Sequence, residues 1–175
     1  HHDKGAREAL EIARASNKKL ILAGIIQDEA YYHQHVEPHL DNDKAVYVGS
    51  AGPAQRNQLL GKACALLHPI NFDEPFGLAV IESMACGTPA IAFNKGSMPE
   101  LIEHGKDGFL VSGCEEAVEH VARIKYVDRS DCRRTVEDRF TVDRMVEKYL
   151  EVYTQVLEEA NKDLRTAKPL RTKHQ

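Results

Sequence analysis

The chain has 175 residues, of which 42% are hydrophobic, enough for one globular domain with a substantial core. Its formal net charge of -4 provides no basic field for nucleic acid or an anionic membrane, so the sequence indicates neither partner. No apolar run approaches the ~18 residues needed to cross a bilayer, and the first residues lack a signal peptide's apolar core. We therefore expect a cytoplasmic protein.

Short apolar runs alternate along the chain with amphipathic stretches of helical length. This alternation predicts an α/β architecture in which helices cover both faces of a parallel sheet of short, buried strands. The expected strands are Leu20–Ala23, Ala45–Val48, Ala65–His68, Ala90–Phe93 and, more weakly, Phe109–Val111. The expected helices are Ala6–Ala15, Glu29–Val36, Gln55–Cys64, Leu78–Ala85, Glu116–Ile124 and Val142–Glu158.

The two ends of the chain differ from this pattern. His1–Gly5 leads directly into a helix with no strand before it, so we expect the chain to begin inside a strand-helix unit of a longer protein. His1 and His2 are either native residues or remnants of a tag. The last helix carries one apolar stripe at helical spacing, which predicts a packing helix. We expect one folded domain over residues 1–160 and a polar, disordered tail over residues 161–175.

The cysteines give no sign of a zinc or redox site. They are widely scattered and include no Cys-x-x-Cys pair: Cys64, Cys86, Cys114 and Cys132. We expect free thiols in a reducing compartment.

The segment that carries chemistry runs from His68, at the end of a predicted strand, to Glu82, inside the next helix. Ligands bind to open parallel sheets beyond the carboxyl ends of the strands. Pro75 holds Glu74 extended, so that its carboxylate can project from the loop. Gly77 lets another molecule approach the backbone, and the first-turn amides of the helix attract a phosphate or diphosphate. The segment thus predicts an anion site beside Glu74.

Glu82 lies eight positions after Glu74, about one turn into the helix and on the side of Leu78. An ionised carboxylate has two acceptor oxygens, which suit the adjacent hydroxyls of a ribose or a hexose. By residue type alone both glutamates would be solvated surface acids. The apolar surroundings of Glu82 favour a partly buried carboxylate that needs partners.

The stretch from Glu74 to Ala92, EPFGLAVIESMACGTPAIA, resembles the signature of the family-four retaining glycosyltransferases of the GT-B type (glycosyl transferases group one). That signature has two glutamates at this separation, followed by an Ala-x-Gly-x-Pro turn. The similarity extends over most of the chain up to about Ala160, through Lys4-Gly5, Ala23-Gly24, Val48–Ser50, Gly96–Ile102, Asp107–Val111 and Phe140-Thr141. The resemblance implies a Rossmann-like, doubly wound parallel sheet that forms the C-terminal half of a GT-B fold.

The resemblance also implies roles for individual residues. Glu74 resembles the glutamate that contacts hydroxyls of the transferred sugar, and Glu82 resembles the one that binds the nucleotide ribose. Gly77 and Leu78 resemble positions whose amides meet the diphosphate, and Lys4 resembles the lysine that neutralises it. The remaining donor-binding candidates are Phe76, Val48 and Gly49, the last two within a base-binding edge, Val48–Gly52, that is read mainly through backbone groups.

In this family the departing phosphate accepts the proton of the acceptor on the same face of the sugar, so no protein nucleophile is required. Glu74 would be the one catalytic residue, acting by charge and position. We expect a nucleotide-diphosphate sugar as donor substrate, no metal and no cofactor. The family's N-terminal acceptor domain and its Gly-Arg strand end are absent from this sequence, so we expect little turnover by this chain alone.

Two other functions remain open. The first is a non-catalytic nucleotide-binding or regulatory module on the same fold, which the loss of either glutamate would have favoured; both are present. The second is a non-hydrolysing sugar epimerase, which should lack the Glu74–Glu82 pattern. The donor base (uridine or guanosine), the hexose and the acceptor stay open.

Four local signals compete with this interpretation. Asp41–Asp43 matches the Asp-x-Asp pattern of metal-dependent glycosyltransferases, but it precedes a strand and is interpreted as a turn. His33, His35 and His39 are interpreted as a surface cluster, because Pro38 breaks the helix that would align them. His68 either lines the cleft or packs in the core. Glu100 is interpreted as a helix-start residue in preference to a sugar ligand.

Overall fold

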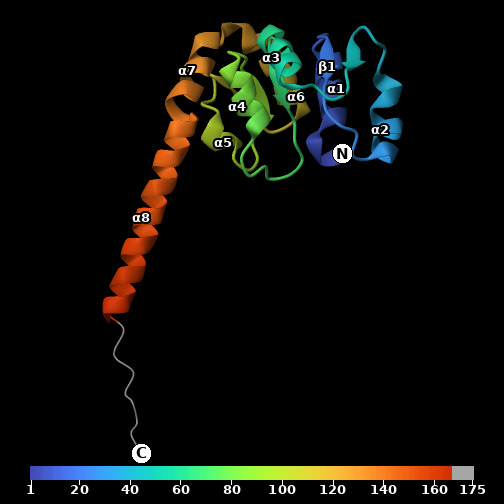
Figure 1. Ribbon diagram of the computed structural model, residues 1–175. Helices are drawn as coiled ribbons and strands as arrows, with labels where there is room; N and C mark the ends of the chain where they lie inside the picture. Colours follow the sequence, from blue (N-terminus) through green and yellow to red (C-terminus); the bar gives the residue numbers. More distant parts are fainter. Residues whose placement is uncertain (167–175) are drawn as a thin grey trace, which may run out of the picture. The chain divides into compact units, whose positions relative to one another are not determined.

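The computed structural model describes residues 1–166 (Figure 1), which fall into two compact units. The first unit is His1–Glu137, and the second begins at Asp138. The first contains all the strands of the described residues and every candidate site residue, so the site can be built within it alone.

The elements follow the predicted alternation. The strands are β1 (Leu20–Leu22), β2 (Ala45–Tyr47), β3 (Leu66–His68), β4 (Ala90–Phe93) and β5 (Gly108–Val111). The α-helices are α1 (Ala6–Ala15), α2 (Glu29–His35), α3 (Pro53–Lys62), α4 (Leu78–Ala85), α5 (Met98–Leu101), α6 (Cys114–Arg123), α7 (Arg129–Arg139) and α8 (Val142–Thr166). Single 3-10 turns are η1 (His2–Lys4), η2 (Glu37–His39) and η3 (Ile124–Tyr126). All five strands and six of these helices were predicted; for α5 only a helix start at Glu100 was expected, and α7 was not predicted.

Every strand pair is parallel, which confirms the predicted α/β class with parallel strands. We expected one sheet, but the described strands form two ladders, β1-β2 and β3-β4-β5. Only β4 is buried along its whole length, while Ile21 in β1 is 44% exposed. The expectation of uniformly buried strands therefore holds for β4 and is wrong for β1.

Helices pack on these strands through their apolar faces. Residues three or four apart in α1 lie on one face, and the residues buried there are Ala9, Leu10, Ile12 and Ala13. That helix contacts α6, and α6 in turn contacts β4 and β5. In Figure 1, α1, β1 and α2 lie together on one side of the first unit, with α4 and α5 on the other. The carboxyl ends of β2, β3 and β4 lead into the loops before α3, α4 and α5, where most of the candidate residues lie.

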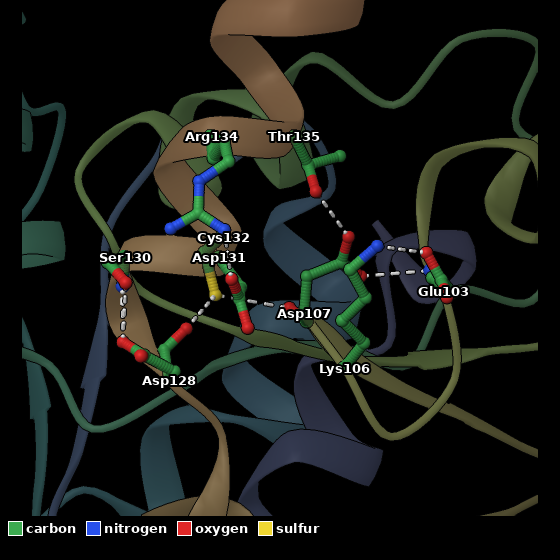
Figure 2. Close-up of polar contacts among 9 residues, drawn as sticks. All are labelled: Glu103, Lys106, Asp107, Asp128, Ser130, Asp131, Cys132, Arg134 and Thr135. Atoms are coloured by element: carbon green, nitrogen blue, oxygen red, sulfur yellow. Dashed lines mark hydrogen bonds and ion pairs between the residues drawn. The ribbon is translucent and has the colours of Figure 1, made fainter.

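A buried carboxylate ties α7 to the loop that precedes β5 (Figure 2). Asp107 is fully buried and accepts hydrogen bonds from the Glu103 amide at 2.8 Å and the Thr135 hydroxyl at 2.8 Å. The Cys132 thiol donates to the Asp107 carbonyl at 3.3 Å. Burial raises the pKa of Cys132 to about 12, so this thiol stays protonated. All four cysteines are unpaired in the structure, as predicted.

Asp107 provides a stability test with a defined pH dependence. Burial raises the pKa of its carboxyl, and the donors at Glu103 and Thr135 offset only part of that effect. Because the carboxyl binds its proton more tightly in the folded state than in the unfolded state, the protonated form contributes to the unfolding free energy below the ordinary pKa. This contribution is lost as pH rises through the folded-state pKa. We therefore expect Asp107→Asn to gain stability relative to wild type from about pH 4 upward.

Urea unfolding of wild type and Asp107→Asn from pH 4 to pH 7 measures this difference. A difference in unfolding free energy that does not change with pH would contradict the expectation. Asp107→Ala serves as the comparison, because it leaves two donors without an acceptor and should lower the unfolding free energy by about 1–3 kcal/mol at every pH.

In the second unit, α8 extends to Thr166, eight residues beyond the predicted helix end and six into the segment expected to be a tail. Residues 167–175 of that tail lie outside the described residues. The residues of the predicted apolar stripe all lie within this helix: Met145, Tyr149, Val152, Tyr153 and Val156. No helix among the described residues has both the length and the apolar character needed to cross a membrane.

Candidate functional site

The loop that leaves the carboxyl end of β3 brings two predicted residues together. Lys4 Nζ lies 3.3 Å from Glu74 Oε2, and the same ammonium lies 4.4 Å from the centre of the Phe72 ring. The Glu74 side chain is 17% exposed and that of Lys4 is 57% exposed. A cation and a carboxylate that are 70 residues apart in sequence therefore lie in contact.

The N-terminal turn that carries Lys4 is fixed against the same loop. The Asn71 amide donates to the Asp3 carbonyl at 2.8 Å, and the Asn71 side chain donates to Glu8 at 2.8 Å. Gly5 has a φ of 70°, and a Cβ there would lie 1.9 Å from the Pro69 carbonyl oxygen. Only glycine allows this close approach, which places Lys4 beside the loop.

The backbone of Glu74 is held by the loop between β4 and α5. The Ser97 amide donates to the Glu74 carbonyl at 2.8 Å, and the Gly96 amide donates to the Asp73 carboxylate at 3.2 Å. Gly96 has a φ of 54°, and a Cβ there would lie 2.4 Å from the Glu74 carbonyl oxygen. The two loops therefore pack backbone against backbone, and Gly96 is the residue that permits it.

We expect Gly96→Ala to displace Glu74 and to lower the unfolding free energy by about 1–3 kcal/mol, because the added methyl collides with backbone atoms. Gly105→Ala is the matched control, since Gly105 also has a positive φ but has open space around the Cβ position. Urea unfolding of both variants separates backbone strain from collision. Equal losses in the two variants would contradict a tight approach at Gly96.

The anion site predicted from the sequence falls at the helix start beyond Glu74. Gly77 caps α4 with a φ of 87° and without a side-chain hydrogen bond, and its carbonyl accepts from the Val80 amide at 3.0 Å. The amides of Leu78 and Ala79, at the first two positions of α4, precede this bond and lie at the positive end of the helix dipole. Phe76 and Leu78 beside them are 51% and 64% exposed, so their surroundings are open to a ligand.

Glu82 lies one turn further along α4 and pairs with a residue that sequence reasoning missed. Arg56 Nη2, on α3, is 3.0 Å from Glu82 Oε1. The Glu82 side chain is 33% exposed and that of Arg56 is 42% exposed, so the pair is half-buried. No spacing in the sequence relates residue 56 to residue 82, and only the packing of α3 against α4 brings them together.

The predicted base-binding edge follows β2 and leads into α3. The Val48 amide donates to the Leu22 carbonyl at 2.9 Å, and the Gly49 carbonyl accepts from the Gly24 amide at 2.9 Å. Gly49 has a φ of 72°, and nothing lies within 4 Å of its Cβ position. This edge is thus held by the end of β1 and remains open on the side of the missing Cβ.

His68 ends β3 close to this site, and its Nε2 is buried with no hydrogen-bond partner among the described residues. Burial lowers its pKa, although the nearby Glu74 carboxylate acts in the opposite direction. The imidazole is therefore neutral at pH 7. The burial of His68 fits the alternative of a packed histidine. Its unpartnered Nε2 is still able to form a hydrogen bond with a ligand.

The competing signals form other structures. The Asp41 carboxylate accepts from the amides of Asp43, Lys44 and Ala45, which is the predicted turn. His33 bonds Glu37 at the surface. Glu100 lies in the first turn of α5. Among the described residues, one group brings possible metal-ligand atoms within 4.8 Å of one another: His1, His2 and Asp3.

Chemically, the site combines two carboxylates, one ammonium group and the start of α4. The carboxylates can accept hydrogen bonds from sugar hydroxyls, while the ammonium group and the helix amides can bind phosphate oxygens. Lys4 lies beside Glu74, and Arg56 lies beside Glu82. Each carboxylate is thus accompanied by one basic side chain.

The family model described as "Glycosyl transferases group 1" matches residues 1–137 of the chain. A Dictyostelium discoideum protein named GDP-Man:Man(3)GlcNAc(2)-PP-Dol alpha-1,2-mannosyltransferase is 29% identical over 147 residues, 77% of this chain and 29% of that protein. A probable sucrose-phosphate synthase of Thermosipho melanesiensis is 41% identical over 80 residues, 44% of this chain and 19% of that protein.

The solved structure of Anabaena Alr3699/HepE in complex with UDP-glucose matches with a TM-score of 0.75 at 21% identity. The match covers 89% of this chain and 46% of that chain, and at this identity it shows the fold alone. The chain thus spans less than half the length of each of these proteins. The match of the family model over most of its length shows that the chain belongs to the glycosyl transferases group 1 family.

Proposed function

We propose that this chain is the donor-binding domain of a retaining glycosyltransferase that transfers a hexose from a UDP- or GDP-linked donor. The observation that carries the proposal is the placement of Glu74 and Glu82 on either side of the α4 start, with Lys4 beside the first. A diphosphate at that helix start would have a carboxylate on each side, one to accept hydrogen bonds from the ribose and one to accept them from the hexose. Glu82 then binds the ribose and Glu74 binds the hexose.

The base lies along the edge that contains Val48 and Gly49, which precedes the helix of Arg56. Glu82 is paired with that helix, so the base edge and the ribose site are neighbours. A relative whose name specifies GDP-Man and a structural match solved with UDP-glucose support both bases as candidates. We propose no choice between them, because backbone groups read the base.

In the proposed reaction the bond from the anomeric carbon to the phosphate oxygen breaks and a bond to the acceptor oxygen forms on the same face. The acceptor hydroxyl gives its proton to the departing phosphate. Lys4 and the α4 amides stabilise the charge that develops on that phosphate. Glu74 orients the hexose and stabilises positive charge on its ring, so it is the catalytic residue in this scheme.

In this proposal an N-terminal domain of the same polypeptide binds the acceptor, and the complete enzyme acts in the cytoplasm. Residues 1–160 act as the donor domain. A regulatory module on the same fold would bind the nucleotide but not distinguish the sugar-linked form from the free nucleotide.

Calorimetric titration of the chain with UDP, GDP, UDP-glucose and GDP-mannose in EDTA tests the proposal. We expect one base to bind, the sugar-linked form to bind more tightly than the free nucleotide, and EDTA to leave binding unchanged because Lys4 provides the cation. Binding of no nucleotide at millimolar concentration would refute the donor-domain function, and equal affinity for free and sugar-linked forms would favour the regulatory module.

A further inference from the structure

The ion pair between Arg56 and Glu82 joins two helices at the carboxylate that the proposed function assigns to the ribose. Arg56 Nη2 contacts Oε1 of Glu82 at 3.0 Å, and the Glu82 side chain makes no other hydrogen bond or ion pair among the described residues. One carboxylate oxygen is thus held by the guanidinium group. The other oxygen, Oε2, remains available to a ligand hydroxyl.

A glutamate at a half-exposed helix position normally samples several rotamers, and ordering it reduces the free energy gained on binding. A planar guanidinium group that holds one oxygen removes part of this freedom before the ligand arrives. We propose that Arg56 is a positioning residue that aims Glu82 at the ribose hydroxyls and thereby sets the preference for ribonucleotides over deoxyribonucleotides. This inference rests on the proposed donor-binding function.

A solvated ion pair of this kind would contribute little by itself. Arg56, however, is not fully solvated: its Nε is buried and has no hydrogen-bond partner among the described residues. Burying a donor without an acceptor is unfavourable. The pair is therefore better explained by a function at Glu82 than by a gain in stability.

The packing of α3 against its neighbours does not depend on Arg56. The Thr88 hydroxyl donates to the Leu60 carbonyl at 2.6 Å. Arg129 donates to the Gly61 carbonyl at 2.9 Å and to the Ala63 carbonyl at 2.8 Å. These contacts fix the C-terminal end of α3, so Arg56→Ala should fold and leave the helix in place.

The test compares the affinity of the chain for UDP and GDP with that for their 2′-deoxy and 3′-deoxy analogues, by calorimetry. We expect wild type to prefer the ribonucleotide by about tenfold or more, as for a lost hydrogen bond to a charged group. Arg56→Ala should reduce this preference to about threefold or less while changing the affinity for the deoxy forms little. Arg56→Lys should show an intermediate ribonucleotide preference, because lysine keeps the positive charge but not the planar geometry of the guanidinium group.

Lys62→Ala is the matched control, since it removes the same charge from the exposed last turn of the same helix. It should keep the full ribonucleotide preference. In a Glu82→Ala background, Arg56→Ala should cause no further change in the preference, because Arg56 acts through Glu82.

Three outcomes would overturn the inference. If Arg56→Ala weakens ribo and deoxy forms by the same factor, the arginine binds the nucleotide directly or supports the fold. If wild type binds nucleotides without a ribose preference, Glu82 does not read the ribose. If wild type binds no nucleotide, the proposed function fails together with the inference, whereas the first two outcomes leave nucleotide binding intact.

Discussion

Glu82→Ala is expected to weaken the binding of the preferred nucleotide diphosphate by about 10- to 100-fold. The carboxylate accepts hydrogen bonds from ribose hydroxyls in the proposed complex, and hydrogen bonds to a charged group contribute about 1.5–3 kcal/mol. The variant also leaves Arg56 without its carboxylate partner beside the ligand. Calorimetry on the 175-residue chain measures the loss directly.

The control for this prediction is Glu119→Ala, which removes an exposed glutamate from α6. It changes the net charge by the same amount at a residue that is not among the candidate site residues, so its affinity should match that of wild type. If Glu82→Ala binds as tightly as Glu119→Ala, Glu82 does not contact the nucleotide.

Glu74→Ala is expected to have a different signature: it should abolish the additional affinity for the sugar-linked nucleotide and leave the affinity for the free nucleotide within about threefold of wild type. In the proposed complex Glu74 binds the hexose and not the base; its side chain is 17% exposed and lies beside Lys4. Comparing UDP with UDP-glucose, or GDP with GDP-mannose, in the same variant provides the internal control.

In the complete enzyme, Glu74→Ala should also reduce the turnover number by about 10²- to 10³-fold, as for the loss of one preorganised group at a developing charge. Steady-state kinetics would show this loss in kcat. A variant with full kcat, or one that loses affinity for free and sugar-linked nucleotides equally, would contradict the role assigned to Glu74.

The sequence was sufficient to predict most elements of the fold because its apolar runs are short and well separated. Strands such as Ala90–Phe93 and helices such as Leu78–Ala85 were predicted with their observed limits. The helix α7 was missed because it is strongly polar and buries only Cys132 and Thr135, so it carries no apolar stripe that could be recognised. Helix α5 is only one turn long.

The candidate site was predictable where the chemistry is local. Glu74, Pro75 and the glycine at the helix start, Gly77, lie within four consecutive residues. Such a short pattern can be recognised in the sequence alone. The resemblance implied separate donor-binding roles for Lys4 and Glu74 but not their contact, and the pairing of Arg56 with Glu82 was not predicted at all. Contacts between elements that are far apart in the chain depend on how the helices pack, and no local spacing encodes them.

The most direct test of the donor-domain assignment is an NMR titration of the ¹⁵N-labelled chain with UDP-glucose and GDP-mannose. The account predicts saturable amide shifts from one of the two donors, concentrated at Lys4, at Val48–Gly52 and at Glu74–Glu82. No shift with either donor, or saturable shifts confined to other parts of the chain, would contradict it.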